Sequence, residues 1–395
     1  MTLVRVSSVS RRAMAACAAV AVAAGVAGCG EAAAPVEPHG AAAFVIGARS
    51  NMPAPRLDGQ ALAVLDDVVE NQSYVSIVVA DGEPSVIGEK DLIVEGANDV
   101  ARDQSRRKNR QEVENGILGA KADDEEVDLL TSLELAARTI RSKQTTPNTI
   151  VVVDSGLSTV APLDFTQEGM LEADPGEVVR SLTDQGSLPD LNGIEVIWQG
   201  MGDTAAPQEP LSNGQRKNLK AIWSAILEAA GSLLTSEEHP LTKPGLEDLP
   251  PVTPVPLSND PECAPGSIVL SGAAVAFLPD SAEFLDPSAA RAVLAPIAKQ
   301  LLAAAGVTVT LTGTTADVGD VPGRIELSQR RAEAVMRVLA ELGVPESSMT
   351  AVGVGSEFSG FIPDHNPDGS LSPGAAAQNR KVIIAPSRPD VLICS

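Results

Sequence analysis

Side chains that could act as nucleophiles, bases or metal ligands are few and scattered in this sequence of 395 residues. Its three histidines, His39, His239 and His365, all lie in segments rich in proline, glycine or aspartate. Residues 154–156 (DSG) follow an apolar run and could mimic a nucleophile turn, but no histidine in an ordered context is there to activate the serine. The sequence has no G-x-S-x-G, H-E-x-x-H, P-loop or C-x-x-C motif. We therefore expect a protein that is not an enzyme and that uses no cofactor and no metal.

The charge and aromatic content exclude another class of function. The chain has 29 Lys and Arg against 52 Asp and Glu, a net charge of −23, and only 2% aromatic residues. An acidic surface repels phosphate backbones, and few aromatic side chains are present to stack on bases. We expect no nucleic-acid partner, and the length and the 44% hydrophobic content suit two or three domains with cores of their own.

The first 29 residues have the pattern of an export signal. Residues 1–12 contain three arginines and no acid, and residues 13–28 are apolar and, at 16 residues, shorter than the ~20 that span a bilayer. The following VAGC, which ends at Cys29, resembles the lipobox of bacterial lipoproteins. That resemblance implies cleavage before Cys29 and acylation of its thiol, as with palmitate, so that lipid anchors the chain to the cell membrane on the extracytoplasmic face. The alternative is a plain signal peptide with a chance cysteine.

The remaining cysteines agree with an oxidising compartment. Cys17 leaves with the signal peptide and Cys29 takes the lipid, so that Cys263 and Cys394 remain. These two bracket the last segment of the chain, and we expect a disulfide between them.

Composition divides the chain into five segments. Proline is concentrated between residues 232 and 262, which we interpret as an extended, semi-rigid linker. The predicted organisation is a signal peptide (1–28), the acylated cysteine with a spacer (29–42), a first α/β domain (43–231), the linker (232–262) and a second domain (263–395).

The first domain alternates apolar, β-branched runs with helical patterns. Strands are predicted over residues 43–47, 74–81, 149–154 and 194–200, and helices over 59–69, 126–142 and 217–230. Near-continuous apolar strands are typical of a sheet buried on both faces. The pattern predicts a doubly wound, mostly parallel sheet with helices on both sides.

Ligands of such sheets bind at the carboxyl ends of the strands. Residues 47–52 (GARSNM) occupy that place and look like the metal loop of the von Willebrand factor A fold, which reads Asp-x-Ser-x-Ser-Met. Residues 127–136 (VDLLTSLELA) resemble the next metal loop of that family, and residues 153–157 (VDSGL) resemble its third. The alternative is another doubly wound α/β domain.

The differences from that family remove the metal ligands. They are Gly47 in place of the metal aspartate, Arg49 and Asn51 in place of the two serines, and Val127 in place of the threonine. In the third loop the family's aspartate falls on either Asp154 or Ser155. A hard cation needs several oxygen ligands, and Arg49 brings a positive charge to its place. We therefore expect a degenerate version of the fold with no metal, used for packing or for binding an envelope protein through its loops.

The second domain has its own α/β rhythm. Strands are predicted over residues 268–277, 307–313, 349–354 and 381–385, with one helix from Asp286 and another over 327–342. Ser328 is a candidate cap for the second helix, and Gly343 is placed to end it. The order predicts a β-α-β-α-β two-layer sandwich of helices on a mixed sheet.

Five motifs of this domain resemble the OmpA-like peptidoglycan-binding family. They are Phe277 with Leu285, residues 313–319 (GTTADVG), 327–332 (LSQRRA), 353–355 (GVG) and 379–382 (NRKV). The resemblance implies a domain that binds diaminopimelate of the wall peptide, with an arginine bound to its carboxylates and an aspartate that faces its ammonium group.

Only part of this set of diaminopimelate-binding residues is present in the sequence. The family's arginine falls on Arg331, its asparagine on Arg324, and its aspartate on Ala316, with Asp317 one residue further along. One step along a strand turns a side chain to the other face, although a bend in the loop could return Asp317 to the site. The resemblance thus implies wall binding through Arg331, Asp317 and Arg324 that is weakened, altered or lost.

Two functions follow from these patterns. The first is a lipid-anchored, non-enzymatic envelope protein that contacts peptidoglycan through the second domain and a protein partner through the first. The alternative is an envelope adhesion or assembly factor in which both domains bind protein partners and wall binding is lost.

Overall fold

The computed structural model describes residues 39–392 except 238, 258–260 and 265. The predicted signal peptide, Cys29 and Cys394 lie outside these residues, and of Cys263 only the backbone is described, so the lipid anchor and the disulfide stay predictions. The described residues belong to one compact unit. No helix of the described part is long and apolar enough to cross a membrane.

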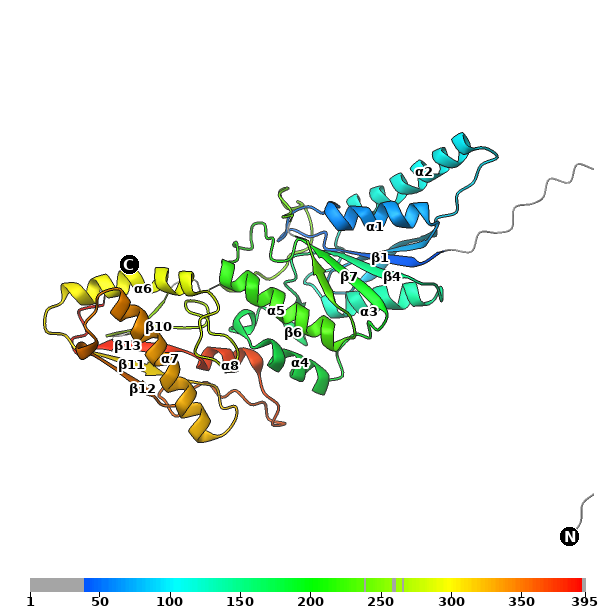
Figure 1. The fold of residues 1–395 in the computed structure, drawn as a ribbon. Coiled ribbons are helices and arrows are strands. Elements are labelled where there is room, and N and C mark those ends of the chain that lie inside the picture. Colours follow the sequence, from blue (N-terminus) through cyan, green and yellow to red (C-terminus); the bar gives the residue numbers. More distant parts are fainter. Residues whose placement is uncertain (1–38, 238, 258–260, 265, 393–395) are drawn as a thin grey trace, which may run out of the picture. The chain divides into compact units, whose positions relative to one another are not determined.

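The first sheet has six strands in the order β3-β2-β1-β4-β7-β8, of which β1, β4 and β7 are labelled in Figure 1. Its parallel strands are β1 (Ala41–Ile46), β2 (Tyr74–Val79), β4 (Asn148–Val153), β7 (Ile194–Gln199) and β8 (Leu234–Ser236). Only β3 (Ser85–Asp91), at one edge, runs antiparallel. A short hairpin of β5 (Thr159–Val160) and β6 (Leu163–Asp164) lies outside this sheet. The predicted mostly parallel sheet is confirmed.

Alternate residues of the strands enter two separate cores. One core contains Ala43 and Val45 of β1 with apolar side chains of α3 (Leu129–Arg141), α4 (Pro175–Asp184) and α5 (Asn213–Ala229). The other contains Phe44 and Ile46 with side chains of α1 (Gly59–Glu70) and α2 (Asp99–Leu118). Helices therefore cover both faces of the sheet, which is why its strands are apolar throughout.

Local capping sets helix ends that the apolar pattern placed a few residues away. The helix predicted from residue 126 begins at Leu129, where the Asp128 carboxylate accepts a hydrogen bond from the backbone N–H of Thr131. The helix predicted from residue 217 begins at Asn213, behind a capping box of Ser212 and Gln215. Both N-termini are fixed by polar side chains that lie outside the apolar stripe.

The proline-rich segment is not a free spacer. Its first part forms β8 of the first sheet, and Leu241, Val252 and Val255 are buried in the two cores of the first domain. The Gln208 side chain accepts a hydrogen bond from Val255 N at 2.7 Å and donates one to Val255 O at 3.2 Å. The prediction of an extended linker over 232–262 is therefore wrong for these residues, because buried apolar side chains between the prolines hold them to the domain.

The second sheet is mixed and has the strand order β12-β11-β13-β10-β9. Its strands are β9 (Glu262–Ala264), β10 (Ser267–Leu270), β11 (Val309–Gly313), β12 (Met349–Gly353) and β13 (Val382–Pro386). The helices of this part are α6 (Pro287–Ala303), α7 (Val321–Glu341) and α8 (Pro373–Asn379), and single 3₁₀ turns are η1 (Met170–Glu172) in the first domain and η2 (Glu346–Ser348) here. Side chains of α6 and α7 share one core with the sheet.

Two predictions for this domain need correction. The strand predicted over 268–277 ends at Leu270, and a turn follows it. Ser328 is not a cap: α7 begins at Val321 behind Asp320, whose side chain accepts from Gly323 N, and Ser328 is buried inside the helix. The predicted glycine stop is confirmed, since Gly343 follows α7 with a φ of +103°.

Glycines let α7 lie directly on the sheet. A Cβ at Gly313 of β11 would lie 2.0 Å from the backbone oxygen of Ser328, and one at Gly353 of β12 would lie 2.3 Å from the backbone nitrogen of Gln329. Ser328 Oγ also accepts a hydrogen bond from Gly355 N at 3.0 Å. The helix that carries Arg331 is thus positioned by backbone contacts.

Substituting alanine for Gly313 tests this packing. Gly313→Ala is expected to lower the free energy of unfolding by about 1–3 kcal/mol, because the added methyl group meets backbone that has no room to move. Urea unfolding measures the effect. The matched control is Gly88→Ala in β3, where a Cβ meets nothing within 4 Å. Equal stability of the two variants would contradict the close packing of α7 on β11.

Candidate functional site

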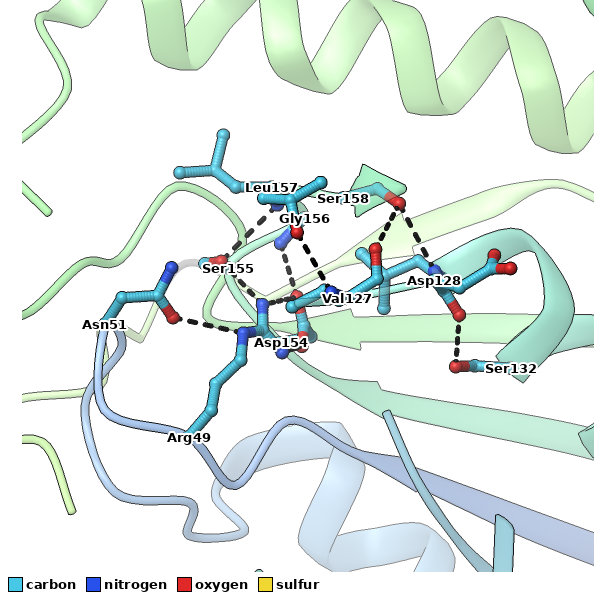
Figure 2. A network of polar contacts seen from close by, with 12 residues as sticks. Arg49, Asn51, Val127, Asp128, Ser132, Asp154, Ser155, Gly156, Leu157 and Ser158 are labelled. Carbon is cyan, nitrogen blue, oxygen red and sulfur yellow. Dashed lines mark hydrogen bonds and ion pairs between the residues drawn. The ribbon is translucent and has the colours of Figure 1, made fainter. Parts of the chain in front are cut away.

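A buried ion pair occupies the carboxyl ends of β1 and β4 (Figure 2). One terminal nitrogen of Arg49 pairs with Asp154 Oδ2, and the other donates to Asp154 Oδ1 at 2.9 Å and to Ser155 Oγ at 3.2 Å. Arg49 Nε donates to Asn51 Oδ1 at 3.1 Å. Both charged side chains are 0% exposed. Arg49, a side chain of the same protein, therefore supplies the positive charge that the buried Asp154 carboxylate needs.

The surrounding residues fit this pair and do not fit a metal ion. A Cβ at Gly47 would lie 2.0 Å from Asp154 Oδ2, so only glycine leaves room for the carboxylate. Asp154 Oδ1 also accepts from Gly156 N at 2.7 Å, and Val127 offers no side-chain oxygen. In the third loop both open choices reach Arg49, Asp154 through its carboxylate and Ser155 through its hydroxyl. A cation placed here would meet the guanidinium group.

The second candidate site surrounds Arg331 of α7, which is 5% exposed. Its Nε donates to Ser281 O at 2.9 Å, and its guanidinium group lies over the Phe277 ring, 5.2 Å from the ring centroid. Burial, and next the charge of Arg380, lower the pKa of Arg331 to about 10, so it remains a cation at neutral pH. No described residue accepts a hydrogen bond from its two terminal nitrogens.

Arg331 lines a cavity of about 370 Å³. Second-domain residues that line it with Arg331 include three further arginines, two acids and two small residues: Arg324, Arg330, Arg380, Asp280, Asp320, Thr315 and Ala316. The structure thus brings Arg331 and Arg324 to one cavity, as the resemblance implied. Sequence reasoning missed Arg380, although it lies in the NRKV motif.

Asp317 is not among the residues that line this cavity. Its carboxylate pairs with Arg324, and its backbone N–H donates to Asp364 Oδ2 at 2.8 Å. Ala316, which is 2% exposed, takes the lining position instead. The single-residue offset between the family's aspartate and Asp317 therefore removes the carboxylate from the cavity.

A small acidic cluster lies on the other side of that loop. Asp317, Asp364 and His365 place one potential ligand atom each within 4.8 Å of one another. Asp364 is already bonded: its Oδ2 accepts from Asp317 N and from Asn379 Nδ2 at 3.1 Å, and its Oδ1 lies 3.0 Å from His365 Nδ1. These bonds hold the loop together, and that is the role we assign to the cluster.

Acidic residues of the first domain also line the cavity. Glu177 of α4 is 6% exposed and pairs with Arg380 at 2.5 Å, and Glu172 and Asp174 lie just before that helix. Gln378 of α8 donates to Glu168 O at 2.9 Å. No local sequence pattern predicts these contacts, because they join residues about 200 positions apart.

The buried ion pair of the first domain makes a prediction for stability. Arg49→Met is expected to lower the free energy of unfolding by about 3–5 kcal/mol, because it leaves the Asp154 carboxylate buried without its partner. The double variant Arg49→Met, Asp154→Asn removes both charges and should recover part of this loss. Urea unfolding of the single and double variants measures the coupling. Strictly additive losses would contradict a direct pair.

Glu172 makes a prediction for pH dependence. Burial is the main cause that raises its pKa, so the folded protein holds this proton more tightly than the unfolded chain does. Its charge therefore opposes folding at neutral pH and not at low pH. Glu172→Gln should raise the melting temperature at pH 7–8, and the gain should vanish at about pH 4, where the unfolded chain is also protonated. The exposed Glu209→Gln serves as the control, and a gain independent of pH would contradict the assignment.

Comparison with known proteins identifies the second domain. Residues 276–369 match the OmpA family. No curated protein matches the chain. Solved structures that resemble parts of it include the peptidoglycan-associated lipoprotein from Burkholderia pseudomallei, with 30% identity, 28% of this chain, 86% of that chain and a TM-score of 0.24. Another is a putative MotB-like protein from Desulfovibrio vulgaris, with 23% identity, 31% of this chain, 72% of that chain and a TM-score of 0.26.

A third is the OmpA-like domain of FopA1 from Francisella tularensis, with 16% identity, 32% of this chain, 80% of that chain and a TM-score of 0.25. The match of residues 276–369 confirms the resemblance of the second domain to the OmpA family, whereas the lipobox and the von Willebrand factor A-like fold stay predictions.

Proposed function

We propose that this protein is a lipid-anchored, non-enzymatic component of the bacterial cell envelope whose second domain contacts peptidoglycan. The observation that carries the proposal is Arg331. It lies within the part of the chain that matches the OmpA family, is held rigidly by Ser281 and Phe277, and keeps both terminal nitrogens for a ligand. A fixed guanidinium group of this kind is suited to a carboxylate of the wall peptide.

The anchor and the first domain complete the proposal. The export signal and the lipobox-like VAGC support a lipid at Cys29 on the extracytoplasmic face of the membrane. In the first domain the ion pair of Arg49 and Asp154 fills the edge where doubly wound sheets bind ligands. The role proposed for this domain is to bind an envelope protein.

One observation favours the alternative, in which the fold is kept and wall binding is lost. Ala316 lines the cavity where the family's aspartate would lie, and Asp317 is turned to Arg324. The second domain by itself therefore offers no carboxylate at that position for an ammonium group. Under this alternative both domains serve protein partners in adhesion or assembly.

Sedimentation with purified peptidoglycan sacculi that contain diaminopimelate separates the two. The full-length chain is expected to sediment with the sacculi, and Arg331→Gln should weaken binding at least about tenfold, because a charge-assisted hydrogen bond to a carboxylate is lost. Arg337→Gln, an exposed arginine of the same helix, removes an equal charge and should bind like the unchanged protein. Absence of sedimentation by the unchanged protein, with its melting temperature intact, would favour the alternative.

A further inference from the structure

We propose that the first domain completes the cavity beside Arg331 as a site for a zwitterionic amino-acid group, with arginines of the second domain on the carboxylates and Asp174 on the ammonium group. This inference rests on the proposed function and names what the site selects. It gives the first domain a part in ligand binding. That part does not involve the carboxyl ends of its strands, which Arg49 fills.

Unsatisfied donors form the positive wall of the cavity. Arg324 Nε and Arg380 Nη1 are buried without a hydrogen-bond partner among the described residues, and the terminal nitrogens of Arg331 are likewise uncommitted there. Thr315 Oγ1 also lacks a partner in the described part of the chain, and Thr315 is 4% exposed. Buried donors without partners are costly in a folded protein, and a bound carboxylate would satisfy them.

Acids that face this wall form the negative side. Asp174 caps α4: its Oδ1 accepts from Gly176 N at 2.8 Å and from Glu177 N at 3.2 Å. Its Oδ2 accepts no hydrogen bond from any described residue and is free for a ligand. Asp174 and Asp280 both line the cavity with Arg331, and their negative charges favour the cationic form of that arginine.

Glu172 and Glu177 are less suited to this role than Asp174. Glu177 is paired with Arg380, and Glu172 accepts from Gln215 Nε2 at 3.3 Å while its pKa is raised by burial. Asp174 is therefore the residue of the first domain with a carboxylate oxygen to spare.

The two walls together define the class of ligand. A simple anion would meet Asp174, and a simple cation would meet the arginines, whereas a group with both charges is stabilised on both sides. A cavity of about 370 Å³ is in the size range of small-molecule sites. Diaminopimelate, with its carboxylates and a free ammonium group, has this chemistry, and Asp174 then supplies the negative charge that Ala316 does not.

Calorimetric titration of the full-length chain in detergent with three probes tests the inference. The probes are meso-diaminopimelate, pimelate, which is the same seven-carbon dicarboxylate without amino groups, and 1,5-diaminopentane, which has no carboxylates. We expect meso-diaminopimelate to bind more tightly than either other probe. Asp174→Asn, which keeps the helix cap, should weaken its binding about tenfold and strengthen pimelate binding, because the carboxylate that repels a simple anion is removed. Arg331→Gln should weaken both.

Asp280→Asn is the matched control, since asparagine tolerates the positive φ of this residue, +48°. It should change diaminopimelate binding less than Asp174→Asn does. The inference is overturned if Asp174→Asn binds diaminopimelate like the unchanged protein, if Asp280→Asn accounts for the whole loss, or if the unchanged protein gives no heat with diaminopimelate. Melting temperatures confirm that each variant is folded.

The same proteins on sacculi keep the two proposals apart. If Arg331 is required for sedimentation and Asp174 is not, the wall contact stands and the composite site fails. If diaminopimelate binding depends on Asp174 but the sacculi do not bind, the composite site stands and the proposed wall contact fails.

Discussion

A guanidinium group removed from water must find compensating charge or hydrogen bonds, and the two domains meet this constraint in opposite ways. In the first domain, Arg49 directs its nitrogens to Asp154, Ser155 and Asn51, and the group is complete without a ligand. In the second domain, Arg331 donates a hydrogen bond to the Ser281 carbonyl and lies over the Phe277 ring, and its terminal nitrogens have no hydrogen-bond partner among the described residues. A site that is internally satisfied is structural, and one that is internally incomplete is open to a ligand. Of these two guanidinium groups, Arg331 is therefore the one whose terminal nitrogens have no hydrogen-bond partner in the part of the chain that the structure describes.

The same constraint accounts for the strand ends of the first domain, which differ from the metal loops of the von Willebrand factor A fold that the sequence resembles. Gly47 leaves the space that the Asp154 carboxylate fills, and Arg49 then neutralises that carboxylate. Gly47 and Arg49 therefore depend on each other, since a side chain at position 47 would displace the Asp154 carboxylate with which Arg49 pairs. The first domain is left with its α4 edge, where Asp174 and Glu177 lie, as the surface that meets charged groups of the second domain.

The sequence predicted those features that local pattern encodes. The four apolar strands of the first sheet were predicted to within a few residues because burial on both faces leaves a continuous apolar signature. α2 was missed because its surface is mostly charged and only three of its residues, Asn109, Val113 and Ile117, are buried. The proline-rich segment was misinterpreted because proline content says nothing of the buried Val252 and Val255. The pair of Glu177 and Arg380 joins positions 203 apart, so no window along the chain contains it.

The acids beside Arg331 are placed where they are costly for folding. Burial raises the pKa of Glu172, and Glu177 Oε2 is buried without a partner among the described residues. The acids share the cavity with Arg324 and Arg380, which also have buried nitrogens without a partner in the described part of the chain. Charges of both signs that face one another across a cavity without fully pairing are each stabilised by a ligand that carries both. The loss of the acid at Ala316 therefore need not abolish recognition, because other acids line the cavity, Asp280 and Asp320 within the OmpA match and Asp174 outside it.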